Sequence, residues 1–119
     1  MKILALEIPV PGIERQAFTG GLLKEEAARA WELHQDGMIR ELFFRADRQS
    51  AVLILECASM EEAGKALSTL PLVRRELIAF DLVPLVPYPG FSRLFEVGWK
   101  AAAGVSEEQR QGDAPETEG

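Results

Sequence analysis

Apolar residues follow two different periods along this chain, and the change of period separates the expected strands from the expected helices. Alternating or continuous apolar runs predict four strands, at Lys2–Ile8, Ile39–Ala46, Ala51–Cys57 and Leu77–Val86. Apolar residues three and four positions apart predict a helix at Leu22–Asp36 and a second helix from Ser59 to about Leu70.

Residues with special backbone preferences mark the expected boundaries of these elements. Residues 10–21 contain prolines and glycines and are predicted to form a loop. Gly37 stands where a left-handed cap would end the first helix. Ser59 and Glu62 form a capping-box pattern at the start of the second helix, and Pro71 is expected to end that helix.

The resulting order of elements, βαββαβ, predicts a fold of the α+β class. Right-handed crossovers in both halves would give a ferredoxin-like, four-stranded antiparallel sheet with both helices on one face. The apolar stripe of the first helix is predicted to face the sheet, with the members Leu23, Ala27, Ala30, Trp31 and His34. We interpret His34 as a hydrogen-bonded histidine of the core.

Strand alternation assigns a second, uncovered set of residues to the other face of the sheet. The face under the helices is predicted to hold Leu4, Leu6, Ile8, Leu42, Phe44, Leu53, Leu55, Cys57, Phe80 and Leu82. The opposite face is predicted to hold Ile3, Ala5, Glu7, Glu41, Phe43, Arg45, Val52, Ile54, Glu56, Asp81, Val83 and Leu85. Because this second set is too apolar for open solvent, it predicts a homodimer whose two sheets pack face to face. Its charged members either line a pocket or form solvated rims and Arg45–carboxylate pairs.

Composition adds limits on size and partners. The chain has 119 residues, 47% of them hydrophobic and 27% charged, which is typical of one small globular domain. We expect residues 1–100 to form that domain, with 88–100 as an ordered C-terminal extension, and 101–119 to be a disordered acidic tail. The formal net charge of −6 argues against binding to nucleic acid.

The remaining sequence signals concern location and cofactors. Cys57 is the single cysteine and cannot form an internal disulfide, and we expect it to be buried and inert. The first apolar run is too short for a signal peptide, and no run is long enough for a membrane span, so a soluble, cytoplasmic protein is expected. With His34 as the only histidine, a histidine–metal cluster is excluded, and we expect no metal and no cofactor.

Residues 37–89 resemble muconolactone delta-isomerase and its relatives. The resemblance rests on an ordered set of residues: Gly37, Arg40, Leu42, Arg48, Ser50, Val52–Glu56, Ser59, Glu62, Leu70–Leu72, Val83–Leu85, Pro87 and Pro89. It implies a dimeric α+β barrel, often assembled into a larger oligomer, and a cofactor-free proton shift on an unsaturated lactone. In the family a histidine occupies the positions of Glu41 and Tyr88. This departure predicts a relative with a different small-molecule ligand.

An allylic proton shift beside a carbonyl needs a base, a hydrogen-bond donor for the developing oxyanion, and a way to return the proton. A carboxylate in an apolar barrel suits the base, because desolvation raises its pKa. The predicted catalytic residues are Glu56, Glu41 and Arg45, and the predicted substrate-binding residues are Glu7, Arg40, Phe43 and Tyr88. The alternative for Glu56 is a strand-end carboxylate paired with an arginine.

Three functions stay open from the sequence. The first is a cofactor-independent isomerase of the muconolactone isomerase-like group. The second is a non-catalytic subunit that binds a small ligand or serves assembly through the same barrel. The third is a cofactor-free monooxygenase or cyclase, which rests on analogy of fold alone.

Overall fold

The computed structural model describes residues 1–96, which divide into two compact units after Val86. The first unit contains β1 (Lys2–Pro9), α1 (Gly20–Gln35), β2 (Ile39–Phe44), β3 (Ala51–Glu56), α2 (Met60–Leu67), α3 (Pro71–Arg74) and β4 (Ile78–Leu85). A short 3-10 helix, Arg15–Ala17, precedes α1, and another, Gly90–Phe95, lies in the second unit. The predicted domain end at residue 100 and the predicted tail 101–119 lie outside the described residues.

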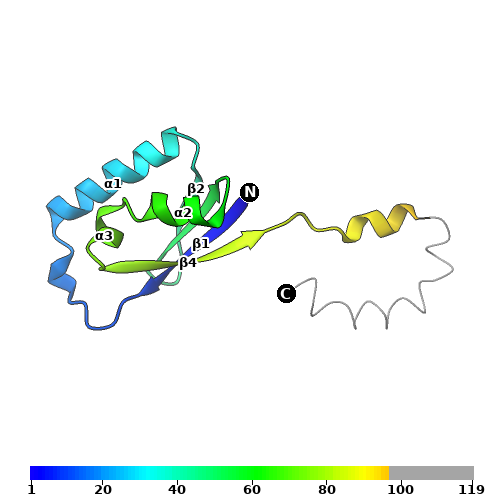
Figure 1. The fold of residues 1–119 in the computed structure, drawn as a ribbon. Coiled ribbons are helices and arrows are strands. Elements are labelled where there is room, and N and C mark those ends of the chain that lie inside the picture. Colours follow the sequence, from blue (N-terminus) through cyan, green and yellow to red (C-terminus); the bar gives the residue numbers. More distant parts are fainter. Residues whose placement is uncertain (97–119) are drawn as a thin grey trace. The chain divides into compact units, whose positions relative to one another are not determined.

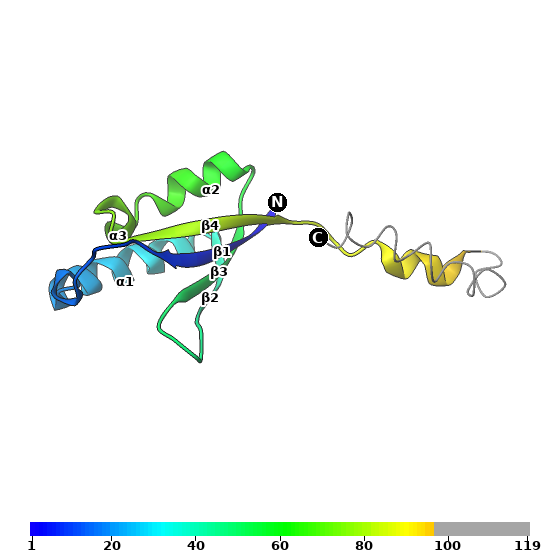
Figure 2. The same ribbon diagram turned by 90° about the horizontal axis from the view of Figure 1, so that it is seen from below.

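The four strands form one antiparallel sheet in the order β2-β3-β1-β4. Both α1 and α2 lie on the same face of this sheet, as the two views of Figures 1 and 2 show. The βαββαβ order and the ferredoxin-like, four-stranded α+β fold predicted from the sequence are therefore confirmed. The short helix α3 is an addition to the predicted set.

Local side-chain chemistry explains where the helices begin and end. α1 begins at Gly20, two residues earlier than predicted, because the Thr19 side chain accepts a hydrogen bond from Leu22 N at 3.2 Å. Ser59 is the N-cap of α2, as predicted, and its side chain accepts from Glu62 N, whereas the Glu62 side chain accepts from Ala58 N one residue before the position that a capping box requires. Gly37 has the expected positive φ of 84° after α1.

Pro71 has a different role from the predicted one. α2 already ends at Leu67, and Pro71 then occupies the first turn of α3. A proline is tolerated there because the first helical N–H groups have no partner within the helix.

One strand is turned over relative to the prediction. Ile3 and Ala5 are fully buried beneath the helices, whereas Leu4, Leu6 and Ile8 are partly or largely exposed on the other face. Ile3 pairs with Leu55 of the central strand, which places the two side chains on the same face. The predicted facing of β1 was therefore wrong by one residue. Both sets of alternating positions in this strand are apolar, so the pattern does not indicate which set lies under the helices.

Two clusters of buried residues fasten α1 to the sheet at its two ends. The larger cluster contains Leu33 of α1 together with Ile3, Ile39 and Leu55, whose side chains are fully or almost fully buried. The smaller cluster joins Leu22 of α1 to Leu72 and Ile78. The middle of α1 belongs to neither cluster, apart from the partly buried Ala30 beside the larger one.

Truncation of core leucines tests this description. Leu55→Ala should lower the free energy of unfolding by about 2–5 kcal/mol, because it leaves a cavity in the larger cluster. Leu42→Ala, on the neighbouring strand where the side chain is 46% exposed, should cost less than about 1 kcal/mol. Urea unfolding followed by circular dichroism measures both values, and equal losses would contradict the assigned core.

Candidate functional site

A pocket of about 640 Å³ lies between α1 and the sheet, beside the middle of α1. Its walls come from α1, from strands β1 to β4 and from the Leu70–Leu72 segment. Most of the lining is aliphatic or aromatic, and four side chains bring polar chemistry to it: Glu7, Glu26, His34 and Gln49. A concave apolar pocket with a few polar groups is the usual form of a small-molecule site.

The apolar stripe of α1 that was predicted to face the sheet lines this pocket. Leu23, Ala27, Ala30, Trp31 and His34 all contribute to its wall. Leu23 is 46% exposed and Trp31 is 59% exposed. α1 is thus rotated so that Leu22, Glu26 and Leu33 turn inward. Of the stripe, Ala30 also packs beside the larger core cluster, whereas Trp31 is largely exposed at the pocket wall.

Glu26 is the carboxylate of α1 that faces inward, and it is half-buried. Its Oε1 accepts a hydrogen bond from Leu72 N at 2.8 Å, at the beginning of α3. Burial raises the pKa of Glu26 above the usual glutamate range; the Leu72 N–H opposes that rise, and the nearby charge of Glu7 adds to it. Within residues 1–96, Oε2 of Glu26 has no hydrogen-bond partner.

Glu7 reaches the same pocket because β1 faces opposite to the prediction. Its Oε1 accepts a hydrogen bond from Ala51 N at 2.8 Å, across the gap between β1 and the start of β3. Its backbone carbonyl accepts from the Ser50 hydroxyl. The prediction that Glu7 lies on the uncovered face of the sheet was therefore wrong, and the residue joins Glu26 on the helix side.

His34 stands near the end of α1 with its ring fixed by the backbone. Its Nδ1 lies 2.8 Å from the carbonyl oxygen of Ile39, and a carbonyl only accepts, so Nδ1 carries the hydrogen. In the neutral ring Nε2 then holds the free lone pair. The ring of Trp31 lies beside it, with 5.7 Å between ring centroids. The hydrogen-bonded histidine was predicted correctly, but the side chain lines the pocket rather than the core.

Glu56, the first predicted base, lies on the uncovered face at the end of β3. Its Oε2 forms an ion pair with the N-terminal amine at 2.7 Å. This hydrogen bond lowers the pKa of Glu56 below the usual range, and the positive charges of Arg40 and Lys2 act in the same direction. The raised pKa on which its predicted role depended is therefore absent in the described chain. Glu56 is a paired strand-end carboxylate, but its partner is the N-terminal amine and not the arginine of the predicted alternative.

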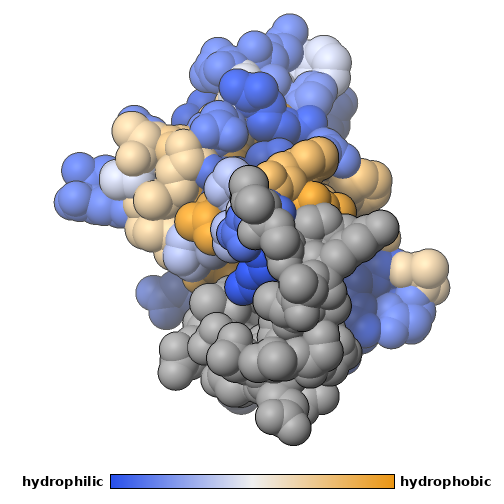
Figure 3. Space-filling model, turned by 90° about the vertical axis from the view of Figure 1, so that its right-hand side faces the viewer, coloured by the Kyte–Doolittle hydropathy of each residue, from blue (hydrophilic) through white to orange (hydrophobic). Residues whose placement is uncertain are grey.

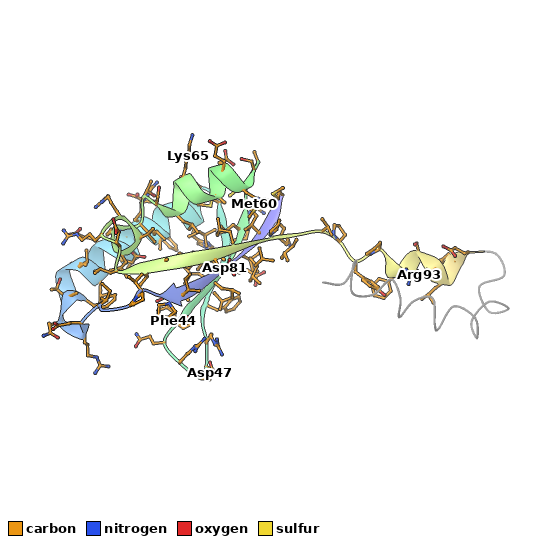
Figure 4. All side chains as sticks on the ribbon, turned by 60° about the horizontal axis from the view of Figure 1, so that its bottom comes forward. Phe44, Asp47, Met60, Lys65, Asp81 and Arg93 are labelled. Carbon is orange, nitrogen blue, oxygen red and sulfur yellow. The ribbon has the colours of Figure 1, made fainter. Side chains whose placement is uncertain are left out.

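The two arginines among the predicted site residues, Arg45 and Arg40, both bind nearby groups of their own segment. Arg45 donates two hydrogen bonds to Asp47, at 2.8 and 2.6 Å, in the β2–β3 hairpin. This pairing raises the pKa of Arg45 and lowers that of Asp47. Figure 4 shows Asp47 at the tip of the hairpin. Arg40 donates to the Gly37 carbonyl at 2.6 Å.

The remaining predicted site residues are not among those that line the pocket. Glu41 and Phe43 pair with Ile54 and Val52, so they belong to the uncovered face, as predicted. Tyr88 lies in the second unit, where its ring contacts Phe91 edge-on at 5.0 Å between centroids. Of the seven predicted site residues, only Glu7 is in the pocket.

The sequence contained a usable signal for the residues that were missed. Glu26 is an acidic residue within one turn of the apolar stripe of α1, and such a position often marks a charged group beside a core or a pocket. Gln49 stands between the predicted strands Ile39–Ala46 and Ala51–Cys57, where a polar residue is ordinary, so no pattern distinguished it. It is nevertheless part of the pocket wall, together with Phe44 and Ala51 of the strands that flank it.

Three further properties of residues 1–96 bear on the site. Cys57 is a buried free thiol, as predicted, and burial raises its pKa. Within this part of the chain, no three side chains of the His, Cys, Asp and Glu types gather to hold a metal ion. None of the described helices is long and apolar enough to cross a membrane.

Comparison with known proteins identifies the fold. No protein-family model and no curated protein matches this sequence. A crystal structure of muconolactone isomerase is similar to this chain, with a TM-score of 0.59 and 22% sequence identity. The match covers 75% of this chain and 92% of that chain. The chain thus has the fold of muconolactone isomerase, as the resemblance in the sequence implied.

The raised pKa of Glu26 predicts a pH-dependent stability difference. A carboxyl whose pKa is higher in the folded state stabilises the protein at low pH, and this stability is lost as pH rises through the folded pKa. A glutamine side chain at this position keeps an oxygen for Leu72 N and does not titrate. Glu26→Gln should therefore be more stable than the parent at about pH 7.5, and the difference should vanish near pH 3.5.

The gain should stay below about 1 kcal/mol, because a half-buried carboxylate keeps part of its hydration. Thermal unfolding at the two pH values measures it. Glu25→Gln, an exposed neighbour on the same helix, removes the same charge outside the pocket and is the matched control. A destabilised Glu26→Gln protein at neutral pH would contradict the assigned cause.

Proposed function

We propose that this protein is a cofactor-independent isomerase that moves a proton within an unsaturated lactone or a related small carbonyl compound. The observation that carries the proposal is the apolar pocket beside α1, which contains one carboxyl group of raised pKa. The fold of a muconolactone isomerase supports it further. The preference for Glu56 from the sequence gives way to Glu26, since among the carboxylates of residues 1–96 Glu26 is the one whose pKa is raised by burial.

In the proposed reaction, the Glu26 carboxylate removes a proton from the carbon next to the substrate carbonyl. The electron pair of that C–H bond moves into the carbonyl, forming a dienolate. The same carboxyl group then returns the proton to the far end of the conjugated system, so that a double bond has moved and no other reactant is needed. A raised pKa favours this role, because a stronger base takes a carbon-bound proton more readily.

Two other pocket side chains complete the chemistry. The Gln49 side chain carries an amide N–H donor for the oxygen on which negative charge develops. His34, fixed through its Nδ1–H, offers a free Nε2 lone pair to a hydroxyl or water on the substrate.

A non-catalytic subunit that binds a small ligand is the second candidate. It is favoured by one observation, the exposed position of His34 and Trp31, which leaves the pocket in contact with solvent on the described chain. Both candidates require the pocket to bind a ligand, and they differ only in turnover.

The activity test uses a butenolide isomerisation that ultraviolet absorbance can follow, with α-angelica lactone and muconolactone as substrates. Glu26→Gln should lower kcat by at least about a thousandfold, because it removes the proposed base. Gln49→Ala should cost about 10–100-fold, since it removes one oxyanion donor.

Glu56→Gln is the matched control, because it replaces a carboxylate on the other face of the sheet. It should keep full activity. Loss of activity in Glu56→Gln but not in Glu26→Gln would restore the base predicted from the sequence. A folded parent protein without turnover on either lactone, yet with bound ligand, would favour the non-catalytic candidate.

We also propose that the protein is a homodimer, or a higher homo-oligomer built on it, through the uncovered face of the sheet. No element of residues 1–86 covers this face, and its apolar members are Leu4, Leu6, Ile8, Phe43, Val52, Ile54, Val83 and Leu85. Figure 3 shows apolar residues exposed among polar ones in the part of the surface that it colours. Large exposed apolar patches usually mark an interface.

Ile54→Arg should convert the oligomer to monomers, because it places a charge at the centre of the proposed interface. Lys65→Glu, on the outer side of α2 in Figure 4, changes the charge away from that face and should leave the mass unchanged. Light scattering coupled to gel filtration measures the mass, and circular dichroism confirms folding. A monomeric parent protein would rule out this interface.

A further inference from the structure

The charge of the pocket wall restricts the kind of molecule it can hold. We infer that the ligand of this pocket is an uncharged, largely apolar compound of two or more fused rings that carries a carbonyl group, and not a small carboxylate. This inference specifies the substrate class for the site in the proposed function. It rests on the size, the charge and the aromatic content of the pocket.

The size of the pocket exceeds the needs of a single five-membered lactone. Its volume of about 640 Å³ lies in the middle of the range of roughly 300–1,000 Å³ in which drug-sized ligands bind. A single small ring would leave most of that space to water against an apolar wall. A fused ring system would displace this water and bury the exposed faces of Leu23 and Trp31.

The charge of the pocket disfavours an anion. Its described lining contains two carboxylates, Glu7 and Glu26, and neither a lysine nor an arginine. The one basic side chain of this described lining is the imidazole of His34, and its Nδ1 is already bonded to the Ile39 carbonyl. A carboxylate ligand would face repulsion from Glu7 and Glu26. Among the arginines closest in the sequence to the pocket-lining hairpin residues, Arg40 and Arg45 are bound to Gly37 and Asp47, and Arg48 is not part of the lining.

The same carboxylates do not form a site for an organic cation. Glu7 accepts from Ala51 N and Glu26 accepts from Leu72 N, so one oxygen of each holds the fold together. Burial also disfavours the charged form of Glu26. An ammonium ion would lose its hydration against a wall that is otherwise aliphatic and aromatic.

Aromatic side chains supply surfaces for a flat ligand. Trp31 of α1, Phe44 of β2 and Phe80 of β4 contribute to the wall from three different elements. Phe44 is 60% exposed and is labelled on β2 in Figure 4. Offset or edge-on contacts of such rings with a fused ring system are worth about 0.5–1.5 kcal/mol each beyond the buried area.

Binding of three matched bicyclic probes tests the inference without any need for turnover. The probes are 2-acetylnaphthalene, which is uncharged, 2-naphthoate, which is an anion of nearly the same shape, and 2-naphthylmethylammonium, which is a cation. Isothermal titration calorimetry on the full chain should show 2-acetylnaphthalene binding at least about tenfold more tightly than either ion, which corresponds to about 1.4 kcal/mol. Glu26→Gln should reduce the difference in binding affinity between 2-acetylnaphthalene and 2-naphthoate.

Two tryptophan substitutions on α1 locate the binding. Ala27→Trp places a bulky side chain in the pocket wall and should abolish binding of 2-acetylnaphthalene. Ala28→Trp, at an exposed neighbouring position outside the lining, should leave it unchanged. Equal effects of the two substitutions would overturn the assignment to this pocket.

The other outcomes separate this inference from the proposed function. Tighter binding of 2-naphthoate or of 2-naphthylmethylammonium, or no binding of any probe to the folded protein, would overturn the inference. Selective binding of 2-acetylnaphthalene with no turnover of the butenolides would leave the inference standing and contradict the butenolides as substrates of the proposed isomerase. Turnover that is faster on muconolactone than on uncharged α-angelica lactone would support the isomerase and contradict the exclusion of carboxylates.

Discussion

The attachment of α1 at its two ends is the constraint on which the rest of this structure depends. Leu33 packs with the larger core cluster, and Leu22 packs with Leu72 and Ile78 in the smaller one. Between these ends α1 has no buried apolar residue and is held by hydrogen bonds of Glu26 to Leu72 and of Arg29 to Thr69, which leaves room beside it. The pocket occupies that room, and the hydrogen bond from Leu72 N to Glu26 fixes the carboxylate at its edge.

The same arrangement gives Glu26 two roles that favour different charge states. As a hydrogen-bond acceptor for the start of α3, the carboxyl group gains from being ionised, since a charged acceptor binds an N–H more strongly. As a half-buried side chain beside Glu7, it gains from being neutral. The second effect is larger, which leaves the fold somewhat less stable at neutral pH and the pocket with a base stronger than an ordinary glutamate.

The two faces of the sheet carry different groups of functional candidates. The helix-covered face carries the pocket with Glu7 and Glu26, and the other face carries a wide apolar surface on which Glu56 pairs with the N-terminal amine. If the second face is the contact with another copy, its carboxylates serve the rim of that contact. The chemistry and the assembly then depend on different residues and can be altered separately by mutation.

The sequence by itself determined the order and type of the elements, because each follows from local signals. Alternation, helical spacing, the Ser59–Glu62 capping pattern and Gly37 act over a few residues, and the ferredoxin-like topology follows from their order. The apolar surface opposite the helices was also evident, since Val52 and Ile54 alternate with the core residues of β3.

Only the tertiary structure decided which way β1 faces and how far α1 is rotated. β1 is apolar at both alternating sets, so its pairing with Leu55 and not its own pattern places Ile3 inside and Glu7 toward the pocket. The apolar stripe of α1 predicts an apolar neighbour, but it does not distinguish a packed core from a ligand pocket. Packing at Leu22 and Leu33 settles this, and it brings Glu26 and Gln49 together from segments far apart in the chain.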